Sequence, residues 1–148
     1  MGTCVFCQIH TGRAPASFVH QCDDFMAIMD IHPMRAGHVL IIPRRHLQYL
    51  HELPKGMRDR LFGLGLEIGN AWRRLGADGL NYVVNDGRAA NQSVPHLHLH
   101  VIPRRQGDTV RLLGRLMLKP LEPLLGPVAR DKLDQQAHVL RATLKKKA

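Results

Sequence analysis

The sequence has few aromatic residues, few cysteines and no long apolar stretch. Phe, Trp and Tyr make up 5% of the 148 residues, and three cysteines are too few for a disulfide framework. No apolar run approaches the roughly 18 to 20 residues of a membrane-spanning helix, and the first residues lack the order of a signal peptide. We therefore expect reduced thiols, no membrane partner and a cytoplasmic location.

Acidic residues are also scarce, with 12 Asp and Glu against 21 Lys and Arg, a net charge of +9. Residues 1–103 carry 10 basic and 8 acidic residues (+2), whereas residues 104–148 carry 11 and 4 (+7). The simplest interpretation of this basic tail is that it forms the solvent-exposed end of a helix. The low aromatic content and the lack of a zinc-finger or ribonucleoprotein motif disfavour a nucleic-acid partner. The tail leaves RNA, an anionic membrane surface or a polyphosphate open as partners.

The overall composition is that of a globular protein. Hydrophobic residues make up 45% and charged residues 22% of the chain, a balance typical of a soluble domain with one core. No internal repeat, low-complexity segment or linker-like stretch divides the sequence. We therefore expect one folding unit, and a disordered chain or a repeat array is excluded.

The apolar pattern predicts strands at 25–30, 38–42, 80–85 and 96–102, with a turn between 31 and 37. From 54 to 75, apolar residues recur at spacings of three and four, which predicts an amphipathic helix that ends at Gly76. Glycines at 63, 65 and 69 indicate close packing of that helix against a sheet or a partner subunit. A second helix is expected near the C-terminus, where apolar residues repeat at 133, 137, 140 and 144. This order favours an α+β fold with a mainly antiparallel sheet, and a parallel βαβ fold is the alternative.

Ten histidines are present, and three of them alternate in the pentapeptide His96-Leu97-His98-Leu99-His100. In a strand, alternate side chains share a face, so the leucines would enter the core while the imidazoles line an exposed or cleft-facing row. Such a row suits either a metal site or covalent catalysis by a neutral imidazole, for example in phosphoryl or nucleotidyl transfer. The amide-rich turn at 85–94, just before this row, could cradle a phosphate. The pair Cys4 and Cys7 is either a metal half-site or a redox pair.

The segment from His96 to Ile102 resembles the signature of the histidine triad (HIT) superfamily, in which three histidines alternate with apolar residues. The resemblance extends, in the family's order, to Asp30-Ile31-x-Pro33, Gly37-His38-x-Leu40-x-Ile42-Pro43, Asn85-x-Gly87, Gln92-Ser93-Val94 and Pro103-Arg104. It covers about residues 4–108. One departure is Asn91, where the family usually has glycine, although Asn tolerates the left-handed backbone conformation better than most residues.

This resemblance implies a HIT-like fold, with an antiparallel sheet of about five strands packed against one long helix and a C-terminal helix. Residues 1–108 would form the HIT core, and residues 109–148 a basic helical extension of the same domain. The family also implies a homodimer whose two sheets join, with the 54–75 helix contributing to the interface.

The resemblance further implies that His98 attacks the α-phosphorus of a nucleotide, forming a nucleotidyl-imidazole intermediate that water hydrolyses. His100 and His38 would bind the phosphoryl oxygens, and the second ring nitrogen of the nucleophile would donate to a backbone carbonyl near His100. Asp30 would accept hydrogen bonds from the ribose hydroxyls, and a plain turn cap is the alternative role for it. The residues left to position the phosphate and the leaving group would be Asn85, Gln92 and Ser93.

A zinc-containing subset of bacterial family members suggests a role for the remaining histidine of the triad. In that subset the first triad histidine joins a Cys-x-x-Cys pair and a histidine after the Ile-Pro strand. Here those ligands would be Cys4, Cys7, His46 and His96, with His51 in reserve. A Cys₂His₂ set is a closed structural site, so zinc would attach the N-terminus to the core. No organic cofactor is implied.

The resemblance implies a nucleotide hydrolase or nucleotidyl transferase. Its substrate would be a purine nucleotide with a substituent on the α-phosphate, such as a dinucleoside polyphosphate or a nucleoside phosphoramidate. Two alternatives remain open. One is a nucleotide-binding regulatory module with incidental turnover, and the other is a nucleic-acid-processing protein that uses the basic tail.

Overall fold

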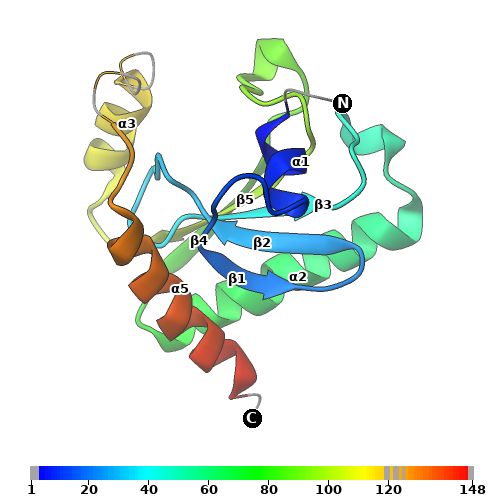
Figure 1. Ribbon diagram of the computed structural model, residues 1–148. Coiled ribbons are helices and arrows are strands. Elements are labelled where there is room, and N and C mark those ends of the chain that lie inside the picture. Colours follow the sequence, from blue (N-terminus) through cyan, green and yellow to red (C-terminus); the bar gives the residue numbers. More distant parts are fainter. Residues whose placement is uncertain (1–3, 119–120, 122–123, 125, 147–148) are drawn as a thin grey trace.

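The β-branched and apolar runs of the sequence form one antiparallel sheet in the computed structural model, which describes residues 4–118, 121, 124 and 126–146. Its strands are β1 (Phe18–Gln21), β2 (Phe25–Met29), β3 (Val39–Pro43), β4 (Gly79–Val84) and β5 (Leu99–Arg104). They lie in the order β1-β2-β3-β5-β4, and each neighbouring pair is antiparallel (Figure 1). The predicted α+β class is therefore confirmed, and the parallel alternative is wrong.

The described helices are α1 (Val5–His10), α2 (Lys55–Arg74), α3 (Thr109–Met117) and α5 (Arg130–Lys145). The long helix α2 lies between Pro54 and Leu75, as predicted, and Gly76 follows it with a φ of 91°. The apolar pattern of the sequence predicted no bounds for α1, β1 or α3, although the resemblance implied about five strands and a helical extension after residue 108. The predicted extension 109–148 holds α3 and α5, but residues 119, 120, 122, 123, 125, 147 and 148 lie outside the described part. Among the described residues, no helix combines the length and the apolar character needed to cross a membrane.

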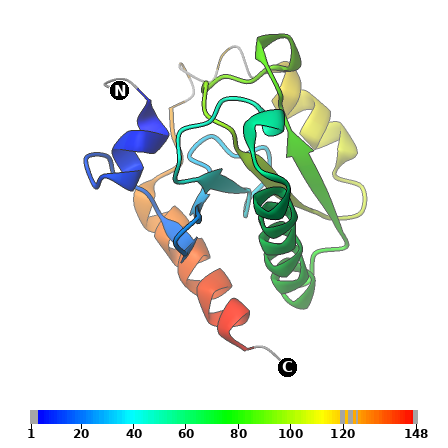
Figure 2. The ribbon, with the colours of Figure 1, turned by 90° about the vertical axis from the view of Figure 1, so that its right-hand side faces the viewer.

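Alternation along the strands gives the sheet two apolar faces. On one face, Phe25, Ala27 and Ile41 belong to a core with α2 and with the buried residues of α5. On the other face, Met26 and Ile42 pack with α1. Figure 2 shows α1 and α2 on opposite sides of the sheet. The helices α2 and α5 therefore cover one face of the sheet, with the β4 residues on that face only partly buried, and the short α1 packs on the second face.

Two glycines allow α2 to approach the sheet closely. A Cβ atom on Gly65 would lie 2.9 Å from the Leu99 side chain, and one on Gly69 would overlap the Tyr82 hydroxyl. Gly63 faces open space. Close packing against the sheet is therefore the role of Gly65 and Gly69.

The strand predicted at 96–102 begins later, at Leu99. The Leu97 N–H donates to the Leu47 carbonyl at 2.6 Å and the His96 N–H donates to Val94 at 2.8 Å, so these backbone groups are used outside the ladder. The leucines of the pentapeptide still point into the core as predicted, because Leu97 and Leu99 are both fully buried. The imidazoles do not form a solvent-exposed row, since His96 and His98 are only 0% and 4% exposed.

Candidate functional site

Two of the triad histidines line a cavity of about 240 Å³ on the α1 side of the sheet. His98 and His100 reach it from the start of β5, and His38 reaches it from the residue before β3. Asp30 and Ser93 are also at its wall. Its apolar lining includes Phe6, Ile9, Ile28, Ile31, Leu40 and Val94. The arrangement is a mostly apolar pocket with a small set of polar groups, which is the usual form of a small-molecule site.

One hydrogen bond assigns the tautomer of His98. Its Nδ1 lies 2.8 Å from the His96 carbonyl oxygen, which only accepts, so Nδ1 carries the proton. The neutral ring then has its lone pair on Nε2. The partner carbonyl belongs to the first histidine of the triad, which corrects the expectation of a carbonyl near His100.

The other two histidines form a directed hydrogen-bonded chain. The Met34 N–H donates to His38 Nδ1 at 3.1 Å, so His38 holds its proton on Nε2. That Nε2 lies 2.9 Å from His100 Nδ1, to which it donates. The His100 proton is then on Nε2, where it can donate to an oxyanion. Asp30 lies 3.3 Å from His38 Nδ1, and Asp30, His38 and His100 form one of two groups with metal-ligand character.

Some of the predicted nucleotide-binding residues line the cavity and others do not. Asp30, His38, Ser93, His98 and His100 all line the same cavity. Asp30 Oδ1 also accepts from the His32 N–H at 2.9 Å, as a turn cap would.

The amide side chains of the preceding turn lie outside this lining. Gln92 is 7% exposed and braces the turn, because its Oε1 accepts from the Gly87 N–H and its Nε2 donates to the Gln48 carbonyl. Asn85 is not among the residues that line the cavity. Asn91 has a φ of 63°, so it supplies the left-handed conformation expected where the family has glycine.

Sequence reasoning missed the part played by Phe6. Its ring meets the edges of His98 and His96 at centroid distances of 5.3 and 5.7 Å. It lies inside the Cys-x-x-Cys segment, which is a helical turn here, so α1 contributes both to the cavity and to the cysteine cluster. The signal in the sequence was a large apolar residue between two predicted ligands.

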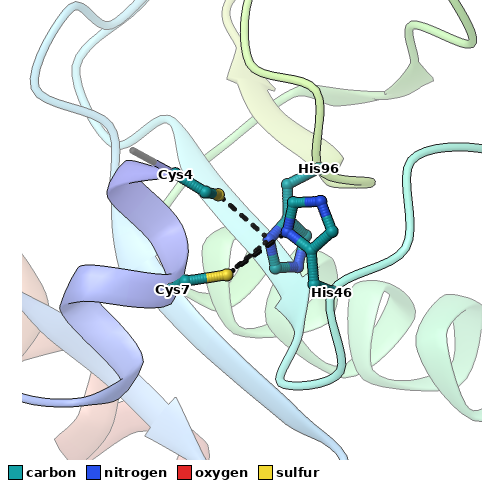
Figure 3. A group of neighbouring side chains, drawn as sticks. All are labelled: Cys4, Cys7, His46 and His96. Atoms are coloured by element: carbon teal, nitrogen blue, oxygen red, sulfur yellow. Dashed lines mark hydrogen bonds between the residues drawn. The ribbon is translucent and has the colours of Figure 1, made fainter. Parts of the chain in front are cut away.

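The four predicted zinc ligands come together from three separate segments (Figure 3). Their ligand atoms all lie within 4.8 Å of one another. Cys7 Sγ is 3.2 Å from His46 Nδ1, and Cys4 Sγ is 3.4 Å from His96 Nδ1. His51 is not part of this group.

These distances suit a tetrahedral zinc ion. Zn–S and Zn–N bonds of about 2.3 and 2.0 Å imply S···N separations of about 3.5 Å. His96 Nε2 lies 2.8 Å from the Pro43 carbonyl, which leaves Nδ1 as the ligand atom and orients the ring. Burial lowers the pKa of His96 to about 4, so the imidazole is in the neutral, metal-binding form. The residues present therefore fit zinc.

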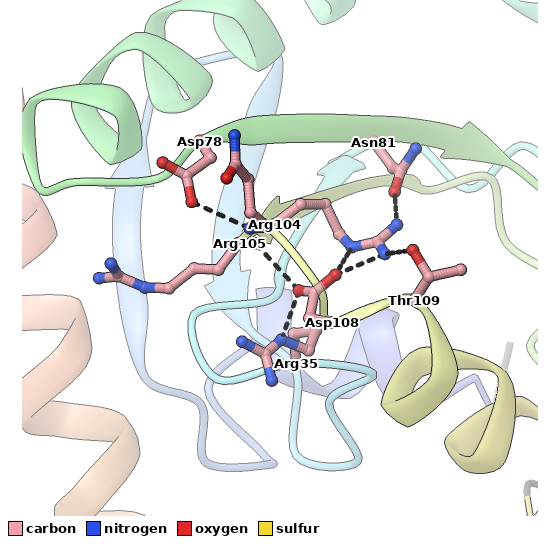
Figure 4. Close-up of polar contacts among 8 residues, drawn as sticks. Arg35, Asp78, Asn81, Arg104, Arg105, Asp108 and Thr109 are labelled. Carbon is pink, nitrogen blue, oxygen red and sulfur yellow. Dashed lines mark hydrogen bonds and ion pairs between the residues drawn. The ribbon is translucent and has the colours of Figure 1, made fainter.

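A separate charged cluster joins the end of β5 to α3 (Figure 4). Asp108, which is 8% exposed, accepts from Arg104 at 2.6 Å and pairs with Arg35 Nε at 3.0 Å. Its second oxygen also accepts from the Arg105 N–H. The Arg104 guanidinium and this backbone donor, with further help from Arg35, lower the pKa of Asp108 to about 2.

This lowered pKa predicts a loss of stability in acid. A carboxyl group with a depressed folded-state pKa stabilises the protein above its unfolded pKa of about 4, and that contribution disappears as the pH falls towards 2. In urea titrations from pH 7 to 2, Asp108→Asn should be less stable than wild type at pH 7 and lose less stability below about pH 4. The control Asp59→Asn, on the exposed face of α2, should follow the wild-type curve. Parallel curves for wild type and Asp108→Asn would contradict the assignment.

A family model for the HIT domain matches residues 11–107 of this chain. An uncharacterized HIT-like protein of Mycobacterium tuberculosis is 39% identical over 136 residues, covering 90% of this chain and 94% of that protein. An adenylylsulfatase of Arabidopsis thaliana is 38% identical over 106 residues, covering 71% of this chain and 54% of that protein.

A solved structure, that of a Zn-bound histidine triad family protein from Mycobacterium smegmatis, superimposes with a TM-score of 0.79 at 37% identity. It covers 97% of this chain and 94% of that one. The similarity therefore includes α3 and α5, which lie beyond the matched HIT-domain segment.

Proposed function

The chain belongs to the HIT-domain family, and on that basis we propose that it is a nucleotide hydrolase. It cleaves purine nucleotide conjugates at the α-phosphate through a nucleotidyl intermediate on His98. The observation that carries this proposal is the bond from His98 Nδ1 to the His96 carbonyl. This bond holds the ring in the tautomer whose Nε2 is a nucleophile, beside the other polar groups of the cavity.

The cavity has separate regions for the parts of a nucleotide. Its apolar wall, which includes Ile28 and Leu40, suits a purine base. Asp30 lines the same cavity, and its carboxylate accepts hydrogen bonds from the ribose hydroxyls. His100 Nε2–H and the Ser93 hydroxyl donate to the phosphoryl oxygens. The α-phosphorus is thereby placed against His98.

The reaction then proceeds in two displacements. His98 Nε2 attacks the α-phosphorus, a P–N bond forms, and the bond to the leaving group breaks, with the electron pair departing on that group. Charge on the phosphoryl oxygens is stabilised by donors already oriented through the Met34–His38–His100 chain. Water then attacks phosphorus, returns the imidazole and releases the nucleoside monophosphate.

We propose that Cys4, Cys7, His46 and His96 hold a structural zinc ion. Bound zinc would supply a cross-link between α1, the segment after β3 and the start of the triad, with no position left open for a substrate. Phe6 lies between two of these ligands and contacts His98, so fixing α1 also fixes one wall of the nucleotide cavity. The reduced thiols required here agree with the expected cytoplasmic location.

The experiment that tests the function uses purified full-length protein with adenosine 5′-phosphoramidate and, separately, with a diadenosine polyphosphate. AMP release is expected, together with an adenylylated protein seen by intact-mass spectrometry in samples quenched at early times. The faster substrate identifies the leaving-group class. AMP binding without turnover of either conjugate would favour the nucleotide-binding module instead.

We also propose a homodimer formed through α2 and the edge strand β4. Both β1 and β4 end the sheet, and they contact α5 and α2, respectively. On β4, Val83 is 38% exposed. On α2, Phe62 and Leu66 are 40% and 56% exposed. An open edge strand next to exposed apolar residues is a pairing surface.

Leu66→Glu should therefore convert the dimer to a monomer, because the change places a charge within the apolar interface. Size-exclusion chromatography with light scattering measures the mass directly. Val139→Glu, at a comparably exposed apolar position on α5 (48%), is the matched control and should leave the dimer intact. A monomeric wild-type protein, or an unaffected Leu66→Glu dimer, would contradict this interface.

A further inference from the structure

A second cavity, of about 450 Å³, lies on the far side of the loop that precedes His38. The Pro33–Ala36 loop, α3 and α5 form its walls, and Met34 is shared with the nucleotide cavity. Among the described residues that line it, none is acidic and four are cationic: Arg35, Arg111, Arg115 and Lys132. We name it the basic groove. Its cations come from three separate elements, so the positive charge results from the tertiary fold.

The helix α3 turns its cationic side towards this groove and its apolar side outwards. Arg115 Nε donates to the Pro33 carbonyl at 3.2 Å, and Arg111 lies one turn earlier on the same wall. Val110 and Met117 are 81% and 80% exposed, and α3 has no buried residue. Apolar burial therefore does not hold α3 in place, and Figure 1 shows it standing away from the sheet.

Within the part of the chain that the structure describes, the nearby acids do not balance the charge of the groove. Asp108 pairs with Arg35, but the same carboxylate is shared with Arg104 (Figure 4). On α5, Asp131 and Asp134 line a different cavity, beside Trp72. The groove therefore keeps an excess of positive charge, and the cations on its facing walls repel one another when no anion lies between them.

We propose that the basic groove binds a small polyphosphate anion, at a site separate from the nucleotide cavity. A chain of phosphates presents several charged oxygens and can contact α3, α5 and the loop at once, which single-point anions cannot do. Arginine is well suited to such contacts because its planar guanidinium donates to two phosphate oxygens. The volume is within the range of small-ligand sites.

Occupancy of the groove would act on the loop between the two cavities. An anion that bridges Arg111 and Arg115 to Lys132 replaces repulsion with attraction and fastens α3 over the Pro33–Ala36 loop. Met34 in that loop donates its N–H to His38. The binding site itself does not depend on any catalytic activity of His98.

Titration calorimetry with inorganic tripolyphosphate in about 0.15 M salt tests the site. Wild type is expected to bind, and Arg111→Gln/Lys132→Gln should bind at least about tenfold more weakly, since each lost charge-assisted contact contributes about that factor. Lys145→Gln/Lys146→Gln removes the same charge from exposed positions at and just after the end of α5 and should bind like wild type. Hydrogen exchange of residues 109–117 should slow when tripolyphosphate is bound.

Three results would overturn the proposal. No binding by wild type would mean that the groove is not an anion site. Equal weakening in both double variants would mean that the groove is only part of a general positive surface. Loss of binding in His100→Ala with retention in Arg111→Gln/Lys132→Gln would place the anion in the nucleotide cavity. That last result would leave the hydrolase proposal intact, so the two proposals fail separately.

Discussion

His98→Ala is expected to lower the rate of AMP release by at least about a thousandfold, the scale on which removal of a catalytic nucleophile acts. The variant lacks the nitrogen that forms the bond to phosphorus, while His100, His38 and Asp30 remain to bind the nucleotide. Turnover should therefore disappear with little change in AMP affinity. Single-turnover assays, AMP titration and intact-mass spectrometry of the adenylylated protein measure the three quantities independently.

His138→Ala is the matched control, since His138 is exposed on α5 and lines a cavity other than that of the nucleotide. It should retain both the wild-type rate and the adduct. Because His98 is 4% exposed, a thermal melt must show that His98→Ala folds. A folded His98→Ala protein that still forms the adenylyl adduct would assign the nucleophile to another residue.

The purified wild-type protein is expected to contain one zinc ion per chain, and Cys4→Ser/Cys7→Ser should contain none. Loss of two of four ligands removes the cross-link between α1 and the segment that begins the triad. Structural zinc sites contribute free energy directly to folding, so the melting temperature should fall by about 10 °C in a chain of this length. Elemental analysis and calorimetry measure the two effects.

Cys22→Ser provides the comparison, because Cys22 is exposed and lies outside the cluster. It should keep the zinc and the wild-type melting temperature. Substrate affinity should weaken in the double variant, since α1 carries Phe6 into the wall of the nucleotide cavity. Full zinc content in Cys4→Ser/Cys7→Ser would show that the metal is held elsewhere.

Local patterns in the sequence predicted the regular elements whose stability depends on near neighbours. The bounds of α2 agree with prediction to one residue at each end, because its apolar spacing, Pro54 and Gly76 all act within a few residues. β2, β3 and β4 followed from apolar runs and turn residues. The elements missed, α1, β1 and α3, are short or lack buried residues of their own. Their positions depend on the segments they contact.

The functional site was likewise predictable from the sequence only in part. Residue types and motif order identified the histidines, Asp30, Ser93 and the four candidate zinc ligands. Periodicity and spacing did not predict the partners of these groups, because the partners lie far away along the chain or depend on backbone direction. The family resemblance alone implied that the cysteine pair would meet His46 and His96. Cys4 meets His96 across 92 residues, and His38 meets His100 across 62. The carbonyl that orients His98 follows from the break in β5 before Leu99.

The sequence by itself therefore determined the fold class, the main helix and the chemistry that the side chains can offer. Only the tertiary structure decided which groups these side chains meet: Gln92 braces a turn, the His96 carbonyl orients His98, and His38 contacts His100. It also assembled the basic groove from three elements. The physical reason is that periodicity and turn preference act over a few residues, whereas a ligand set or a charged cavity depends on which distant segments share a face of the sheet.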